Sequence, residues 1–396
     1  MHRRRRQRHR SRPRHRLAAV TRAHLRATTS FMTTRFGAQV PTPALVVDLE
    51  RCERNIEAMA QRAATAGVDL RPHVKTHKCP ALATRQLAAG AVGVTTATLG
   101  EAEIFADHGA QDVFVAYPLW AGDDLGHRVA ALSEQVRLAV GADSVEAVEL
   151  LARATGGTVG LRVLVEIDSG LGRSGVSPKN AEPVALAVDR AGLELGGVFT
   201  FPGHRYAPGM ARAARDDEDR ALAEAASALG AVGLPCPVRS GGSTPTASLT
   251  PGAAVSELRP GVYIFNDAQQ VALGTCGVDD VALAALATVV STPAPGRAVL
   301  DAGAKVLGPD RPAWTPGHGL LPDRPAARVT GLWEHHAVVD QSATLAAGLP
   351  RLRLGDHVAL VPNHVCTAVN LARQLHVVAG GEVVERWEVA AAGINR

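Results

Sequence analysis

A lysine within a cluster of basic residues is the first candidate for covalent chemistry. The cluster RPHVKTHK runs from Arg71 to Lys78 and begins in an apolar run that reads as a strand, so Lys75 lies where that strand ends. A lysine amine forms a Schiff base with an aldehyde when desolvation or neighbouring cations lower its pKa. We expect His77 and Lys78 to supply those cations. Taken alone, the segment is also compatible with a solvated basic loop.

Glycine-rich or polar turns follow three later strand-like runs. They are EIDSGLGRSGV (166–176), which carries Arg173, FPGHRY (201–206) and SGGSTPT (240–246). Glycines allow close backbone approach, and hydroxyls with backbone amides can hold a phosphate. A further strand, GVYIF (261–265), contributes Tyr263 and leads to Asp267. A lysine, an arginine and a phosphate-type loop at strand ends together point to a phosphorylated aldehyde cofactor, pyridoxal phosphate.

His364 and Cys366 form a second candidate site, in the run VPNHVCTAVN (361–370). Residues two apart on a strand face the same side, and an imidazole together with a thiolate suits zinc. Two protein ligands leave room for water and substrate, so we interpret the pair as an open metal site. The alternative is a buried cysteine beside a hydrogen-bonded histidine, with no metal.

Strand-like and helix-like runs alternate in the part of the chain that holds Lys75. Apolar runs occur at 70–74, 92–98, 112–117, 136–140, 161–167, 195–201, 237–240 and 261–265. Helical patterns occur at 50–66, 79–91, 100–109, 143–155 and 178–192. Eight strands in βα alternation predict a (β/α)8 barrel of TIM type, whose active site lies at the carboxyl ends of the strands. The spacing alone also allows an open doubly wound sheet; chemistry at the strand ends favours the barrel.

Beyond about Cys276 the helical pattern stops. The runs at 281–292, 297–303, 326–339, 356–365 and 381–390 read as strands separated by Gly, Pro and Asp turns. We therefore predict a cofactor-binding barrel over residues 42–270 and a mostly β domain over residues 271–396 that carries the metal site. A strand at 42–49 (TPALVVDL) precedes the barrel and could pair into it or join the β domain.

The charge of the chain is unevenly distributed. Residues 1–30 hold eleven of the 42 basic residues, all arginines, and no acidic residue, which leaves 31 basic against 38 acidic residues elsewhere. Such a segment repels itself in any compact form, so we predict a disordered extension over residues 1–34. No apolar run is long enough for a membrane span, the five cysteines are scattered, and no nucleic-acid module is visible. We expect a cytoplasmic protein without membrane or nucleic-acid partners.

Six motifs resemble those of one family. They are TPALVVDL, RPHVKTHK, EIDSGLGRSGV, SGGSTPT, ELRPGVYIF and PNHVCTAVN. From Thr42 onward the chain resembles the metal-dependent branch of the alanine-racemase-barrel pyridoxal-phosphate enzymes, which contains D-threonine aldolases and eukaryotic-type D-serine dehydratases. The resemblance implies an alanine-racemase-type barrel with a β domain. It also implies a homodimer, in which the β domain of one subunit helps close the site of the other.

The resemblance implies roles for individual residues. Lys75 would carry the cofactor covalently and act as the catalytic residue, and Arg173 would lie against the pyridine nitrogen and keep it unprotonated. His364 and Cys366 would bind the metal. The remaining cofactor contacts would come from the phosphate loop and from three ring-packing or phosphate-contacting side chains: Ser240, Gly241, Gly242, Ser243, Thr244, His204, Tyr206 and Tyr263.

The reaction implied is that of a lyase on D-3-hydroxy amino acids that takes a small-molecule D-amino acid as substrate. Members with His-x-Cys are more often dehydratases, members with His-x-Asp are more often aldolases, and a thiolate favours zinc. We therefore predict a D-serine dehydratase that forms pyruvate and ammonia. The alternative is a D-threonine aldolase that forms glycine and an aldehyde.

Two other activities are disfavoured. A racemase of this class uses a tyrosine base from the carboxyl-terminal domain, and no tyrosine follows Tyr263. A non-catalytic pyridoxal-phosphate carrier of this barrel type lacks a β domain. Two departures from the family pattern, Arg205 and the second histidine of WEHH (333–336), leave the identity of the substrate open.

Overall fold

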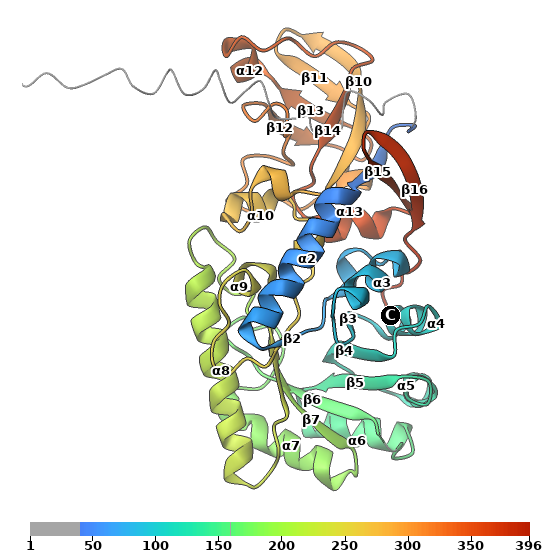
Figure 1. Cartoon of the computed structure of the whole chain (residues 1–396), viewed down its shortest axis with the longest axis vertical. Helices are drawn as coiled ribbons and strands as arrows, with labels where there is room; N and C mark the ends of the chain where they lie inside the picture. Colours follow the sequence, from blue (N-terminus) through green and yellow to red (C-terminus); the bar gives the residue numbers. More distant parts are fainter. Residues whose placement is uncertain (1–39, 159) are drawn as a thin grey trace, which may run out of the picture. The chain divides into compact units, whose positions relative to one another are not determined.

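Two eight-stranded sheets organise the chain (Figure 1). The computed structural model describes residues 40–396 apart from Val159, and the extension predicted over residues 1–34 lies outside this part. One sheet forms the wall of a parallel barrel, and the other is the centre of a β domain. Within residues 40–396, no helix combines the length and the apolar character needed to cross a bilayer.

Eight parallel strands form the barrel. In spatial order they are β2 (Asp69–Leu70), β9 (Glu257–Leu258), β8 (Val238–Gly241), β7 (Glu194–Phe199), β6 (Arg162–Glu166), β5 (Arg137–Ala142), β4 (Asp112–Pro118) and β3 (Val94–Thr96). The two ends of this sheet meet, because Thr95 N donates to Pro72 O at 2.8 Å and His73 forms a parallel bridge with Thr95. The predicted (β/α)8 barrel is confirmed.

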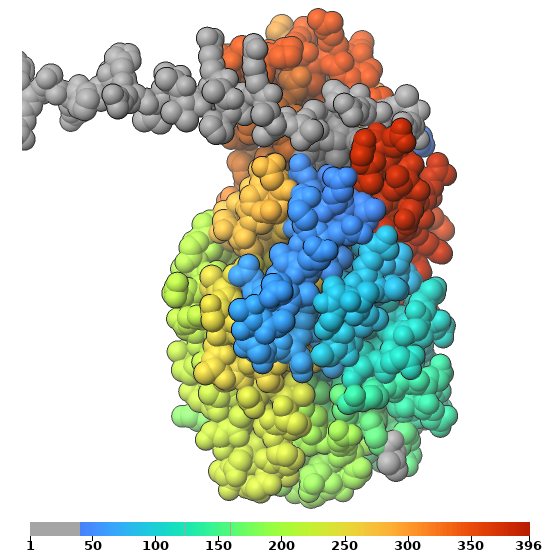
Figure 2. Space-filling view, in the orientation of Figure 1, coloured from blue at the N-terminus to red at the C-terminus, as the bar shows by residue number. Residues whose placement is uncertain are grey.

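Helices lie between the barrel strands. They are α2 (Leu49–Ala66), α3 (Pro80–Ala88), α4 (Leu99–Asp107), α5 (Asp123–Ser133), α6 (Val145–Ala154), α7 (Ala181–Arg190) and α8 (Ala211–Ala231). Helix α2 precedes the first strand. Asp48 caps it by accepting a hydrogen bond from Arg51 N at 2.9 Å, and Gly67 ends it at a φ of 66°. Its exposed side forms part of the face in Figure 2, in dark blue. The sequence patterns included neither α5 nor α8.

One predicted barrel strand is wrong. The run 261–265 is not the eighth strand, because β9 ends at Leu258 and Val262–Ile264 forms a 3-10 turn. Pro260 has no amide hydrogen to donate, so it cannot continue the ladder. Val262, Ile264 and Phe265 are instead buried in the same apolar cluster as Leu283 and Leu360 of the β domain. This apolar run therefore joins the barrel to the β domain.

The β domain is built on a mixed sheet. Its order is β12 (Arg328–Leu332), β13 (Ala337–Asp340), β11 (Arg297–Leu300), β10 (Leu283–Ala294), β1 (Ala44–Asp48), β15 (Gln374–Ala379) and β16 (Glu382–Glu388), with β14 (His357–Leu360) also paired to β10. Strand β1 runs antiparallel to β10 and parallel to β15, so it lies in this sheet and not in the barrel. The sequence patterns did not include β15.

His364 and Cys366 do not lie on a strand, contrary to the prediction. Strand β14 ends at Leu360, and helix α13 (Val365–Leu371) begins directly after His364. Pro362 cannot donate to a sheet, and Asp267 Oδ2 accepts a hydrogen bond from Val365 N at 3.1 Å, which stabilises the first turn of the helix. The remaining short helices are α9 (Thr244–Ala247), α10 (Ala268–Leu273), α11 (Ala304–Leu307) and α12 (Ser342–Ala346).

Candidate active site

A cavity of about 380 Å³ lies at the carboxyl ends of the barrel strands and extends to the β domain. Loops after β2, β6, β7, β8 and β9 line it on the barrel side, and α13 contributes from the β domain. Eight of the predicted site residues line this one cavity: Lys75, Arg173, Tyr206, Gly242, Ser243, Thr244, His364 and Cys366. The structure thus brings together a lysine, a hydroxyl-rich loop and a histidine–cysteine pair from distant parts of the chain.

Lys75 lies in a 3-10 turn, Val74–Thr76, that follows β2. Burial lowers the pKa of its amine; the negative charge of Cys366 opposes this shift, and the positive charges of Arg173 and Arg259 add to it. Its Nζ lies 5.8 Å from the centre of the Phe201 ring. An amine in such surroundings is a better nucleophile and base at neutral pH than an exposed lysine.

The two cations that the sequence assigned to Lys75 have other partners, so that prediction is wrong. Lys78 Nζ pairs with Glu101 Oε1 at 3.0 Å, and both side chains are buried. His77 is buried, shares a hydrogen bond with Gln86 and accepts one from Cys79 N at 3.1 Å. Burial lowers the pKa of His77 to about 4, so the ring is neutral at pH 7.

Arg173 lies at the mouth of the cavity on the loop after β6. Its guanidinium is 5.5 Å from the centre of the Phe201 ring and 3.7 Å from Glu166 Oε1. The loop is held by Asp168, whose Oδ1 accepts hydrogen bonds from Gly170 N at 2.8 Å and Gly172 N at 3.1 Å. More than half of the Arg173 side chain is exposed, so it is free to contact a bound molecule.

The loop between β8 and α9 forms one wall of the cavity. Ser243 caps α9, and Thr246 Oγ1 accepts a hydrogen bond from Ser243 N at 2.9 Å. Gly242 has a φ of 91°, and a Cβ there would come within 3.1 Å of Arg259 N, so glycine is required on both counts. Tyr206 shares a side-chain hydrogen bond with Ser243, and burial raises the pKa of its phenol.

Ser240 and Gly241, also predicted as phosphate contacts, face protein groups. Ser240 Oγ donates to Glu257 Oε1 at 2.6 Å and accepts from Arg259 Nε at 2.8 Å. A Cβ on Gly241 would collide with the carboxylate of Glu218. Neither residue lines the cavity. They support the loop from behind, where a direct cofactor contact had been expected.

His204 and Tyr263 do not line the cavity either. His204 Nε2 lies 2.9 Å from Asp217 Oδ2, and the Tyr263 hydroxyl accepts a hydrogen bond from Gln86 Nε2 at 2.8 Å. Arg205, a departure from the family pattern, donates from Nε to the same Asp217 oxygen at 2.6 Å. Asp217 therefore anchors the loop that presents Tyr206 to the cavity.

His364 and Cys366 bring nitrogen and sulfur donors to the β-domain side of the cavity. His364 Nδ1 lies 3.4 Å from Asp267 Oδ2, and Cys366 Sγ lies 3.3 Å from Thr76 Oγ1. Burial opposes ionisation of Cys366, but the charge and hydrogen bond of His364, the charge of Lys75 and the hydrogen bond with Thr76 together lower the pKa of the thiol. The charge of Cys366 in turn raises the pKa of His364. Within the described residues, no group of three or more His, Cys, Asp or Glu side chains is placed to hold a metal ion.

Sequence reasoning missed three buried charged residues around the cavity: Glu166, Glu218 and Arg259. Arg259 lines the cavity, donates to Thr200 O at 2.6 Å, and lies 5.1 Å from the centre of the Phe199 ring. A signal was present, because Glu257 and Arg259 flank a buried leucine in ELRPGVYIF. Charged residues in so apolar a run indicate a buried pair or a ligand contact.

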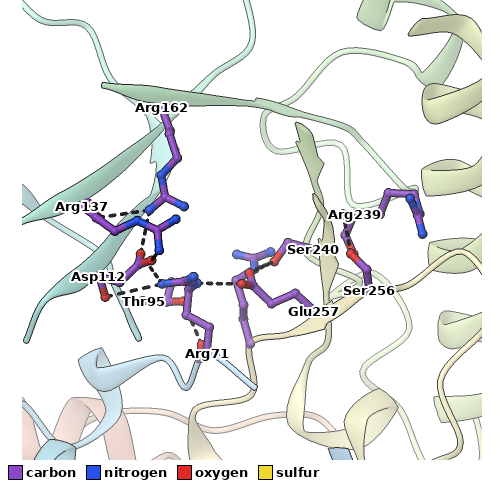
Figure 3. Close-up of polar contacts among 10 residues, drawn as sticks. Arg71, Thr95, Asp112, Arg137, Arg162, Arg239, Ser240, Ser256 and Glu257 are labelled. Carbon is purple, nitrogen blue, oxygen red and sulfur yellow. Dashed lines mark hydrogen bonds and ion pairs between the residues drawn. The ribbon is translucent and has the colours of Figure 1, made fainter. Parts of the chain in front are cut away.

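A network of charged side chains links several strands of the barrel (Figure 3). Arg71 Nε pairs with Glu257 Oε2 at 2.7 Å, and Arg71 Nη1 pairs with Asp112 Oδ1 at 2.7 Å. Arg162 Nη2 reaches the same Asp112 oxygen at 2.7 Å. Through Glu257 and Ser240 this network continues to Arg259 in the cavity wall. Burial in this network fixes the position of Arg259 more firmly than a surface arginine could be fixed.

Comparison with known proteins finds matches over nearly all of the described chain. The family profile "Alanine racemase, N-terminal domain" matches residues 47–269, and "Putative serine dehydratase domain" matches residues 282–378. The D-threo-3-hydroxyaspartate dehydratase of Delftia sp. (strain HT23) is 37% identical, over 88% of this chain and 96% of that protein. The D-threonine aldolase of Arthrobacter sp is 33% identical, over 91% of this chain and 94% of that protein.

Among solved structures, a D-threo-3-hydroxyaspartate dehydratase with a cysteine-to-alanine mutation, in a metal-free form, matches with a TM-score of 0.81. It is 35% identical, and the match covers 89% of this chain and 98% of that one.

Proposed function

Since the chain belongs to the alanine racemase-fold pyridoxal-phosphate lyases, we propose that it is a D-serine dehydratase, which converts D-serine to pyruvate and ammonia. The observation that carries the proposal is the contact between the β domain and the barrel: Cys366 Sγ lies 3.3 Å from Thr76 Oγ1, next to Lys75 in the chain. A base and a metal-ligand pair therefore face one cavity, as the loss of a hydroxyl from Cβ requires.

The cavity fits pyridoxal phosphate. Lys75 offers a buried amine of lowered pKa for the covalent link. Gly242, Ser243 and Thr244 line the cavity together, so the loop offers backbone and hydroxyl groups that can hold a phosphate. The exposed side chain of Arg173 supplies positive charge at the mouth. When bound, the cofactor withdraws electrons from the bonds at Cα of the substrate.

The residues of this chain perform the remaining work. Lys75 Nζ takes the proton from Cα, and its lowered pKa favours the unprotonated amine that acts as the base. His364 and Cys366 would hold a divalent ion, which would supply Lewis-acid polarisation of a hydroxyl. Arg173 and Arg259 provide the positive charges that orient anionic groups in the cavity. Phe201, against which both Lys75 and Arg173 lie, excludes water from their side of the cavity.

Zinc is the proposed ion, because a thiolate ligand favours it over manganese. The metal-free state of the cysteine-to-alanine mutant of a similar dehydratase supports a role for Cys366 as a ligand. A homodimer is proposed from the family resemblance and is tested by light scattering of the purified protein. One mass equal to that of a single chain would exclude it.

The alternative activity, D-threonine aldolase, is favoured by the 33% identity to the Arthrobacter enzyme. The two activities give different products from the same class of substrate, so one assay separates them. The purified protein is incubated with D-serine, D-threonine and D-threo-3-hydroxyaspartate, and keto acid, ammonia, glycine and aldehyde are quantified. Pyruvate and ammonia from D-serine support the proposal, whereas glycine with an aldehyde as the main products would replace it with the aldolase.

A further inference from the structure

A buried carboxylate lies directly behind the loop that lines the cavity after β8. Glu218, on the inner side of α8, is only 1% exposed. Its Oε1 accepts a hydrogen bond from Gly242 N, and its carboxylate occupies the space where a Cβ of Gly241 would lie. Gly242 itself lines the cavity. One layer of backbone therefore separates Glu218 from whatever the loop binds.

A second connection runs through Thr246. The Thr246 side chain shares a hydrogen bond with Glu218, and Thr246 Oγ1 accepts from Ser243 N at 2.9 Å. Ser243 also lines the cavity and shares a hydrogen bond with Tyr206. The charge on Glu218 is therefore coupled to the loop through both Gly242 N and Thr246.

The neighbouring groups offset only part of the free-energy cost of burying the charge of Glu218. Burial raises the pKa of Glu218 to about 7, against the opposing effects of the Gly242 hydrogen bond and the Arg259 charge, and Asp219 on the same helix adds to the rise. Tyr206 is the other titratable group that faces it, and it is neutral at pH 7 because burial raises the pKa of its phenol. Arg259 is shared with Glu257 and Glu166, which also act on its charge.

We propose that Glu218 takes up a proton from solvent when the phosphate group of the cofactor binds to the loop Gly242–Thr244, so that the neutral side chain becomes the support of the occupied site. The proposal rests on the proposed function only for the place of the cofactor. The phosphate and the ionised Glu218 carboxylate would be two negative charges on either side of one backbone layer, and each disfavours the other. Protonation of Glu218 removes one of these charges and breaks no covalent bond. Its oxygen keeps accepting from Gly242 N, and the added proton sits on the carboxyl group.

Linkage gives this proposal a measurable sign. If protonation of Glu218 accompanies phosphate binding, cofactor affinity falls as the pH rises above about 7, because binding then takes up a proton and the proton concentration in solution is lower. Glu218→Gln copies the neutral form and keeps an oxygen for Gly242 N. In this variant, therefore, cofactor affinity does not fall with pH through the titration of residue 218.

The test is equilibrium dialysis of the full-length protein, depleted of cofactor, at about pH 6.5, 7.5 and 8.5, to obtain the Kd for pyridoxal phosphate. We expect the ratio of the wild-type Kd to the Glu218→Gln Kd to rise with pH, with a ceiling of about tenfold per pH unit. The exposed Glu224, on the same helix, provides the control: the ratio of wild type to Glu224→Gln stays constant. Pyridoxal, which lacks the phosphate, gives a constant ratio with Glu218→Gln.

A ratio for pyridoxal phosphate that stays constant with pH overturns the proposal, and so does an equal rise for pyridoxal.

A second measurement uses wild-type protein alone, in case the variant fails to fold. Calorimetric titration of cofactor-depleted full-length protein, in two buffers of different ionisation enthalpy, gives the protons taken up per ligand. More uptake with pyridoxal phosphate than with pyridoxal supports the proposal, and equal uptake overturns it. Absence of D-serine turnover, with this linkage intact, would count against the proposed function alone.

Discussion

Cys366 Sγ and Thr76 Oγ1 lie 3.3 Å apart, across 290 positions of sequence. Thr76 belongs to the same 3-10 turn as Lys75, and Cys366 lies in the first turn of α13. Any shift of α13 relative to that turn would change the distance between the proposed metal ligands and the lysine amine. The contact therefore fixes the two chemical groups of the cavity with respect to each other.

Cys366→Ala should remove the metal and stop elimination while sparing the cofactor. A single imidazole holds a divalent ion poorly, whereas the lysine and the loop that hold the cofactor lie on the barrel. Metal content by atomic emission and pyruvate release are measured for the variant and for wild type before and after EDTA. The control is Cys236→Ala, since Cys236 does not line the cavity. Full activity in a metal-free preparation would contradict the proposed role of His364 and Cys366 as metal ligands.

Lys75→Ala should abolish turnover and the visible absorbance band of the lysine-bound cofactor. The covalent anchor and the base are the same nitrogen in this cavity, so both properties disappear together. Absorbance spectra and pyruvate assays are recorded for this variant and for the control Lys179→Ala. The Lys179 side chain is exposed in the 3-10 turn Pro178–Asn180, just before α7. A visible band that persists in Lys75→Ala, and that borohydride removes while leaving the cofactor covalently attached, would place the anchor on another lysine.

Asp112→Ala should destabilise the barrel by about 3–5 kcal/mol, because it leaves Arg71 and Arg162 as buried cations without this partner. The matched control is Glu103→Ala, which breaks the half-exposed pair with Arg128 and should cost about 1 kcal/mol or less. Both are measured by urea unfolding followed by circular dichroism. Equal effects of the two substitutions would show that the network in Figure 3 contributes no more than a surface pair.

Glu218→Gln should stabilise the cofactor-depleted protein at alkaline pH and not at acidic pH. The folded state raises the pKa of Glu218 from 4.5 to about 7, so the folded state binds more protons than the unfolded state between these values. The stability that this group contributes is present below pH 4.5 and is lost as the pH rises through about 7. Melting curves of both proteins at about pH 5 and pH 8 test the sign. A larger advantage of the variant at the lower pH would contradict it.

The sequence predicted several of the residues that line the cavity better than it predicted the residues that support them. Lys75, Arg173 and the His364–Cys366 pair stand out because reactive side chains follow strand-like runs, and all four line one cavity. Their partners could not be read in the same way. Glu101, which neutralises Lys78, and Asp267, which caps α13 from 98 positions away, are neighbours only in the folded chain.

Two local errors have the same origin. The run 261–265 has the apolar content of a strand, but its side chains are needed between the barrel and the β domain, so packing and Pro260 override the strand pattern. The segment around His364 alternates as a strand would, yet Pro362 and the distant Asp267 make it the start of a helix. In both places a tertiary contact decides between two conformations that the local sequence allows.

The pairing of β1 with β10 has a consequence for the order of folding. Val47 lies opposite Leu283, and Asp48 N donates to Ala282 O at 2.8 Å, so the two points at which the chain enters and leaves the barrel are joined by one ladder. Closing a loop of roughly 230 residues is entropically costly until the intervening chain has collapsed. We therefore expect the barrel to fold first. Its folding brings β1 and β10 close together, and the β-domain sheet then forms on this pair of strands. The proposed metal-ligand pair, which depends on that sheet, would then be among the last features to assemble.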